Sequence, residues 1–155
     1  AREIIHEEAM IYQEKIAKIR PEMEGKSILI FTYPKSMDWI CDLACDLGMN
    51  ILKIGLCYSP FSETFVSRYS DRYPVVHNYS LEMRSDDIKN LKPDLVLLTY
   101  PSLRSCEHAR SAHIPYCPGF GFHAGIDQAM YWNIQMKVPV VEGWRHEMEE
   151  RSDVV

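Results

Sequence analysis

Short apolar runs alternate with helical stretches along residues 27–137, and this alternation is the feature that most constrains the fold. Ser27–Thr32 and Asp94–Thr99 are nearly continuous apolar runs, as expected of strands covered on both faces. Strands that alternate with helices predict a parallel sheet between helical layers. We therefore expect an α/β fold of three α/β/α layers, Rossmann-like, with a predominantly parallel sheet of four to five strands. The predicted strands are 27–32, 51–57, 74–78, 94–99 and 114–116.

The predicted helices begin with residues 3–20, where apolar residues recur at alternating spacings of four and three and so form one stripe. Pro21 and Gly25 are expected to end this helix. The stripe could pack on its own domain or on another chain, and we expect the former. Further helices are predicted after an N-cap at Ser36, over 60–71, from caps at 85–87 to Leu91, from Ser102 or Ser105 to about Ala112, and over 127–137.

Length and charge limit the class of protein. The chain has 155 residues, of which 46% are hydrophobic, and a formal net charge of −5. This size suits one domain, 1–155, with an N-terminal helix (1–20), an α/β core (27–137) and a tail (138–155). No apolar run approaches the ~20 residues of a membrane span, and a net acidic chain disfavours nonspecific binding of nucleic acid. Five cysteines without a CxxC pair indicate reduced thiols in a cytoplasmic protein.

Ligands of open parallel sheets bind beyond the carboxyl ends of the strands, so the loops there hold the candidate site residues. After the first strand, Lys35 and Ser36 stand at a helix N-terminus, which favours an anion. The simpler interpretation is an ordinary cap at Ser36 beside a solvated Lys35, because capping alone explains Ser36. After the fourth strand, Ser102 and Arg104 are candidates; Arg104 is either a carboxylate clamp or a surface charge.

The loop before the last helix contains glycines spaced as GxGxxxG, from Gly119 through Gly121 to Gly125, with Glu142 further on. A dinucleotide site is one interpretation, but such a fingerprint belongs to the first βα unit, and a tight glycine turn is the other. His123 lies in the same loop. The spacing of histidines and cysteines fits no zinc pattern, and we predict no metal site in this domain.

Several short segments, in a fixed order, resemble one family. They are Gly25–Ile30, Asp46–Met49, Lys92–Val96, His113–Pro115, Gly121 and Ala124–Asp127. Together they are similar to a Rossmann-like domain of the nitrogenase component 1-type oxidoreductases, which include the nitrogenase molybdenum-iron protein subunits, cofactor-assembly relatives and protochlorophyllide reductase subunits. The resemblance covers about residues 15–137.

The resemblance implies a fragment of a larger multi-domain subunit, whose loops form the wall of a cofactor or substrate pocket. It implies an iron–sulfur cluster or related metallocluster in the full-length protein and none in the isolated domain. It also implies partners: other domains of the subunit, a homologous subunit and an ATP-dependent donor similar to the iron protein. Lys35, Ser36, Ser102, Arg104, Gly119, Gly121 and His123 would then contact the cofactor.

The resemblance is imperfect at the position of the family's cofactor-ligating histidine. Ala124 occupies that position here, and His123 lies one residue earlier. Because no complete acid–base pair, nucleophile or cluster motif is present, we expect the domain alone to be non-catalytic. A non-catalytic metallocofactor carrier or assembly scaffold, a flavodoxin-like binding module and, less favoured, a dinucleotide-binding enzyme domain are the alternatives.

Overall fold

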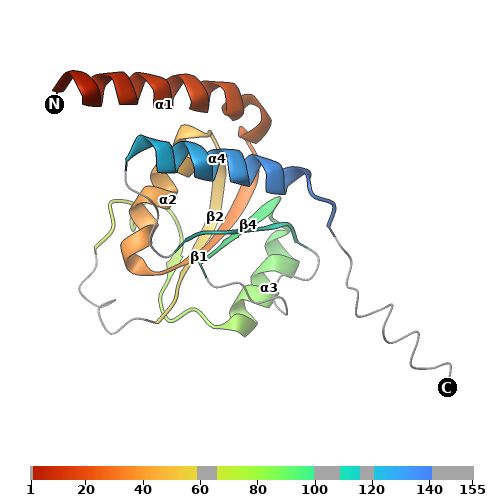
Figure 1. The fold of residues 1–155 in the computed structure, drawn as a ribbon. Coiled ribbons are helices and arrows are strands. Elements are labelled where there is room, and N and C mark those ends of the chain that lie inside the picture. The colour runs from red at the N-terminus through yellow and green to blue at the C-terminus, as the bar shows by residue number, and fades with distance from the viewer. Residues whose placement is uncertain (1, 59–65, 100–108, 116–120, 141–155) are drawn as a thin grey trace.

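The computed structural model describes residues 2–58, 66–99, 109–115 and 121–140. Within them, four helices and five strands alternate along the chain (Figure 1). The helices are α1 (Arg2–Met23), α2 (Pro34–Asp46), α3 (Leu81–Leu91) and α4 (Phe122–Lys137), and the strands are β1 (Ser27–Thr32), β2 (Asn50–Leu56), β3 (Val75–Val76), β4 (Leu95–Leu98) and β5 (Ser111–His113).

The strands form one sheet in the order β3-β2-β1-β4-β5, and every neighbouring pair is parallel. The chain therefore proceeds outward from β1 to β3, crosses back through α3, and continues on the other side of β1 with β4 and β5. This doubly wound α/β architecture confirms the predicted fold class.

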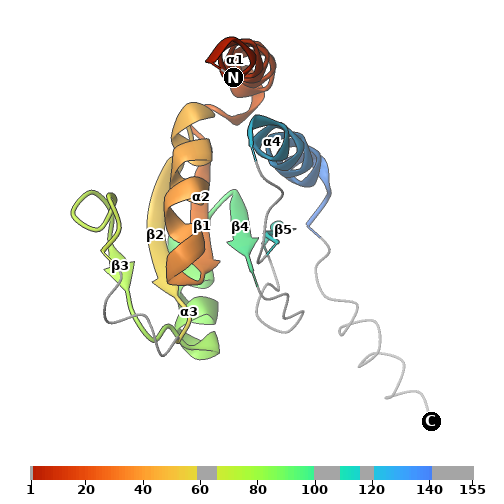
Figure 2. The same cartoon turned by 60° about the vertical axis from the view of Figure 1, so that its left-hand side comes forward.

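Alternate residues of each central strand supply two separate cores, because successive side chains of a strand point to opposite faces. Ile28 and Ile30 of β1 pack with α1, α2 and α4, whereas Leu29 and Phe31 pack against α3. Figure 2 shows α2 in front of β1 and β2, with α1 and α4 side by side above them and α3 behind. The first core is the larger, and it contains the fully buried Trp132 of α4.

Two helix boundaries differ from the sequence prediction because of proline. Pro21 does not end the first helix: α1 continues through it to Met23, and the backbone N–H of Glu24 still donates to the carbonyl of Arg20 at 2.8 Å. An exposed proline in the last turn removes only one hydrogen bond. Ser36 is not the N-cap of α2. The cap is Tyr33, because Pro34 fits the first helical position, where an N–H has no intrahelical partner.

Other boundaries are corrected in the second half of the chain. The cap of α3 is Ser80, whose hydroxyl accepts from the N–H of Met83 at 3.2 Å, rather than a residue in 85–87. The last strand lies at 111–113 instead of 114–116, so no helix extends to Ala112. Residues 68–72 form turns rather than the end of a helix, and α4 begins five residues before the predicted position.

The remaining parts of the two misplaced helices, 60–65 and 102–108, lie outside the described residues, as does the tail from 141. Across the helices that are described, none has both the length and the apolar character of a membrane span.

Candidate functional site

The switch point of the sheet lies between β1 and β4, where the chain leaves in opposite directions. Thr32 ends β1 and Thr99 follows β4, and their hydroxyl oxygens lie 2.8 Å apart. Both residues are buried, and the N–H of Thr99 donates to the carbonyl of Phe31 at 3.0 Å. Crevices at such switch points are the usual ligand sites of open α/β sheets.

Lys35 and Ser36 lie at this same carboxyl edge, in the first turn of α2. Lys35 is exposed, whereas Ser36 is buried and its N–H donates to the carbonyl of Tyr33 at 3.0 Å. The predicted position of Lys35, at a helix N-terminus directly after the first strand, is therefore confirmed. Whether either residue binds a cofactor stays a prediction.

Arg84 is a candidate that the sequence analysis missed. It lies one turn into α3, is 4% exposed, and its guanidinium carbon lies 5.4 Å from the centre of the Phe31 ring. A buried guanidinium over an aromatic ring is held by a cation–π contact. Arginine is rarely buried without a specific reason. No motif marks Arg84 in the sequence, because it lies inside α3, eight residues after the end of β3.

Cys57 comes directly after β2, and the charge of Arg84 acts on its thiol. Its N–H donates to the carbonyl of Thr32 at 2.9 Å, which fixes it next to the end of β1. Burial raises the pKa of the Cys57 thiol, and the nearby Arg84 guanidinium offsets part of that rise. The thiol is therefore protonated at neutral pH and is no ready nucleophile.

His123 lies elsewhere, in the first turn of α4, which follows Gly121 at φ +84°. Its Nε2 is 2.9 Å from a carboxylate oxygen of Glu8 in α1. The neighbouring Phe122 ring lies 5.4 Å from the ring of Tyr12.

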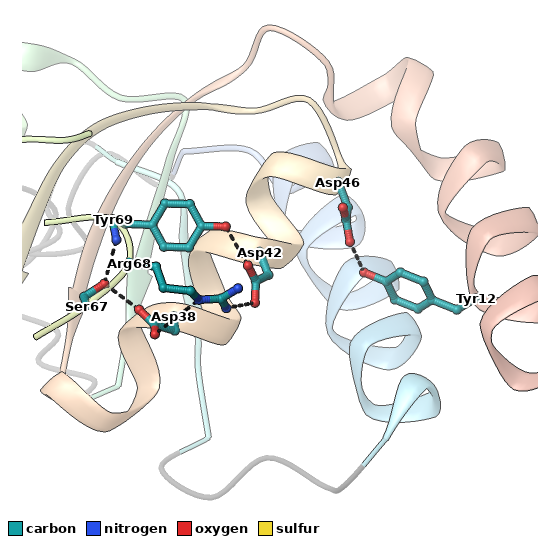
Figure 3. A network of polar contacts seen from close by, with 7 residues as sticks. All are labelled: Tyr12, Asp38, Asp42, Asp46, Ser67, Arg68 and Tyr69. Atoms are coloured by element: carbon teal, nitrogen blue, oxygen red, sulfur yellow. Dashed lines mark hydrogen bonds and ion pairs between the residues drawn. The ribbon is translucent and has the colours of Figure 1, made fainter. Parts of the chain in front are cut away.

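The Tyr12 hydroxyl in turn donates to Asp46, the last residue of α2, at 2.6 Å (Figure 3). This contact places the start of α4 beside the C-terminal end of α2, whereas Lys35 lies at its N-terminal end. Those two ends are roughly 20 Å apart in a helix of this length. The structure thus does not bring His123 together with Lys35. Ser102, Arg104 and Gly119 lie outside the described residues.

Gly125, the last glycine of the GxGxxxG spacing, serves helix packing. A Cβ atom there would lie 2.9 Å from a ring carbon of Tyr12, so the glycine lets α1 approach α4 closely. Among the described residues no group of three or more His, Cys, Asp or Glu could hold a metal ion, and Cys41, Cys45 and Cys57 are free thiols.

Carboxylates on α2 fix the segment that precedes β3 (Figure 3). Asp38 accepts from the Ser67 hydroxyl at 2.5 Å, and Asp42 accepts from Arg68 at 2.6 Å and from the Tyr69 hydroxyl at 2.5 Å. The hydrogen bond to Asp42 raises the pKa of Tyr69. Arg68 offsets part of the negative charge of Asp38 and Asp42, and we assign these contacts a structural role.

The doubly wound parallel sheet with helices on both faces defines a Rossmann-like α/β domain. The sequence profile of the nitrogenase component 1 type oxidoreductases matches residues 1–131, and the chain belongs to this family. Solved structures agree in fold: "Nitrogenase Cp1 at pH 5" has a TM-score of 0.64 and "Nitrogenase Cp1 at pH 6.5" one of 0.63, each at 11% identity over 89% of this chain. The match spans only 36% and 38% of those chains. Among curated proteins, none matches this sequence.

Proposed function

We propose that this chain is a pocket-forming domain of a nitrogenase component 1-like oxidoreductase. The carboxyl edge of the sheet would form one wall of a cofactor or substrate cavity. The junction of Thr32 and Thr99 at the switch point carries the proposal, because the surrounding loops are where such sheets bind ligands. Membership of the family supports the oxidoreductase class.

At this edge the chain's own residues would bind and orient an anionic group. Lys35 supplies an exposed ammonium group in the first turn of α2, and the buried Arg84 adds positive potential beneath the ends of β1 and β2. In a buried environment such charges act over a longer range than in water. We propose a binding role for both residues and no catalysis by the domain alone.

The larger protein would supply the redox centre. The match to only 36–38% of the similar chains supports the proposal that residues 1–155 are one domain of a larger multi-domain subunit, which we expect to be cytoplasmic. We propose that other domains and a homologous subunit complete the cavity, that the whole protein carries an iron–sulfur cluster or related metallocluster, and that an ATP-dependent donor similar to the iron protein supplies electrons.

The described residues do not fit a cluster by themselves. They offer no group of three potential ligands, and His123 is paired with Glu8 at the far end of α2 from Lys35. Any cluster would therefore be ligated mainly by residues from other parts of the protein. This placement, with Ala124 at the position of the family's ligand, favours the second candidate, a metallocofactor carrier or assembly scaffold, over a nitrogen-reducing enzyme.

The complete protein that contains this chain provides the test. It would be purified without oxygen as wild type, Lys35→Glu and Lys89→Glu, and its iron and its bound organic ligand would be quantified by metal analysis and mass spectrometry. Lys89 is the matched control, because it is an exposed lysine in the last turn of α3, at the opposite edge of the sheet.

We expect Lys35→Glu to lower the content of the bound cofactor or ligand severalfold and Lys89→Glu to leave it unchanged. Equal contents in all three proteins, with unchanged circular dichroism, would contradict the pocket role of this edge. Transfer of the cluster to an acceptor protein without substrate turnover would instead identify the carrier.

A further inference from the structure

Two cysteine side chains lie one helical turn apart on α2. Cys41 is fully buried in the larger core, and Cys45, near the end of the helix, is half-buried. Residues four apart on a helix are neighbours on one face, with Cβ atoms about 5–6 Å apart. Burial raises the pKa of the Cys41 thiol to about 12, and Cys45 adds to the rise, as expected of two neighbouring thiols.

The spacing of this thiol pair disfavours a disulfide but suits an ion between the two sulfurs. A disulfide needs Cβ atoms about 3.5–4.5 Å apart, which is closer than a regular helical turn allows. Two metal–thiolate bonds of about 2.3 Å each span about 4.6 Å when the ion and both sulfurs are in line. The pair can therefore hold an ion while α2 stays helical, whereas a disulfide would require the helix to distort.

The number of ligands decides which ion fits. The prediction of no metal site was based on zinc, which takes four ligands. In the part of the chain that the structure describes, no group of three potential ligands is present, so the pair supplies two sulfurs and no third ligand. Thiolates favour soft ions such as Cu(I) over magnesium or calcium. Cu(I) is also an ion that two thiolates in a line can satisfy.

The charges around the pair favour a cation. Asp38 and Asp42 lie on the same helix, and both carboxylates raise the pKa of the Cys41 thiol, whereas Arg68 lowers it. Arg68 is itself exposed and lies within ion-pair distance of both carboxylates. Two carboxylates against one guanidinium leave a negative potential beside the sulfurs, and this potential attracts a cation.

The segment that precedes β3 covers the pair and supplies a polar contact to it. The Tyr73 hydroxyl oxygen lies 3.4 Å from Sγ of Cys45, so the hydroxyl can donate to the sulfur once an ion has replaced the thiol proton. The backbone N–H groups of Ser70, Arg72 and Tyr73 donate to carbonyls within the segment itself. The contacts with α2 drawn in Figure 3 are made by side chains, so the segment can open without breaking the sheet.

We propose that Cys41 and Cys45 bind one soft monovalent metal ion, of which Cu(I) is the example, in a line between their sulfurs. Binding exchanges protons for the ion: two S–H bonds break, two Cu–S bonds form, two protons pass to the solvent and no electron is transferred. The site lies toward the C-terminal end of α2, whereas Lys35 lies at its start. It is therefore independent of the pocket proposed above.

Anaerobic titration of the 155-residue chain with Cu(I), in competition with a chromophoric Cu(I) chelator, tests this proposal. Two complementary variants are matched controls. One replaces Cys57, Cys106 and Cys117 by serine and keeps the pair, and the other replaces Cys41 and Cys45 by serine and keeps the other three. We expect the first to bind one Cu(I) with the wild-type affinity. The second should bind it at least about 100-fold more weakly, since even an outer partner of a ligand is worth about 10- to 100-fold.

Two further measurements test the geometry. X-ray absorption of the Cu(I)-loaded variant that keeps the pair should show two sulfur neighbours. The affinity should rise with pH, by up to about 100-fold per unit, because two protons leave for each ion bound. Excess Zn(II) should not displace Cu(I), since the pair offers only half of the ligands that zinc requires.

Circular dichroism and a thermal melt show whether each variant folds as the wild type does. Should the loss of the buried Cys41 thiol unfold the second variant, Cys45→Ser removes one ligand at a half-buried position and carries the same expectation. Equal Cu(I) affinity in the two complementary variants, or a pair that binds no Cu(I), would overturn the proposal. A third sulfur neighbour in the absorption spectrum would overturn it as well.

Discussion

The hydroxyl pair at the switch point, Thr32 and Thr99, gives the sharpest test of the site's architecture. Their oxygens are 2.8 Å apart and both residues are buried. Replacing one threonine by valine keeps the shape but leaves the other hydroxyl without this partner, which costs about 1–3 kcal/mol. Replacing both removes the two polar groups together and can be nearly neutral. We therefore expect Thr32→Val and Thr99→Val each to destabilise the chain and the double variant to be more stable than the two effects added.

Urea unfolding followed by far-ultraviolet circular dichroism measures these free energies, provided that the slope against denaturant is unchanged. A loss of 1 kcal/mol should lower Tm by about 2–4 °C in a chain of this size. Thr32→Ser and Thr99→Ser are matched controls, because they keep the hydroxyl groups and remove only methyl groups. Strictly additive valine substitutions would refute the hydrogen bond, whatever the size of the single effects.

Three further predictions concern packing, pH and ligand specificity. Gly55→Ala should destabilise the chain by about 1–3 kcal/mol in urea unfolding, because the added Cβ would lie 2.6 Å from the ring of Tyr79; unchanged stability would contradict this packing. Two hydrogen bonds from Ser27 lower the pKa of Asp94. The stabilisation that they give is complete above the unfolded-state pKa of about 4 and is lost as the pH falls through the lower pKa of the folded state. Asp94→Asn should therefore flatten the dependence of the free energy of unfolding on acidic pH, and an unchanged pH dependence would contradict this role of Asp94. Isothermal titration with NADH or NADPH should show no micromolar binding, since Tyr12 occupies the space beside Gly125; micromolar binding would revive the dinucleotide interpretation.

The layered fold was predictable because its signals are local. A buried run such as Ser27–Thr32 becomes a strand wherever helices cover both faces, and β1 has the predicted bounds. Helix starts were less predictable, since several residues near each start can cap. Pro34 fits the first helical position of α2, so the helix begins there and Ser36 is not its cap. In α3 the cap is Ser80, five residues before Ser85.

The candidate site was only partly predictable, since sequence spacing does not show which end of a helix a later element contacts. Lys35 follows β1 directly, so its position at the carboxyl edge follows from topology alone. His123 also comes ten residues after a strand, β5, but the contact of Phe122 with Tyr12 brings the start of α4 to the other end of α2. That contact depends on Tyr12 of α1, which lies 110 residues before Phe122 in the chain.

The burial of Arg84 shows how one helix cap determines the chemistry of the edge. Because α3 begins after Ser80, Arg84 already lies inside the helix, one full turn from the cap, and its side chain covers the ring of Phe31. A helix that began at 85, as the sequence analysis predicted, would leave Arg84 in the preceding loop with access to water. A guanidinium in water is screened and contributes little potential at the ends of β1 and β2. The electrostatic character of the proposed pocket wall therefore depends on a serine that no ligand would touch.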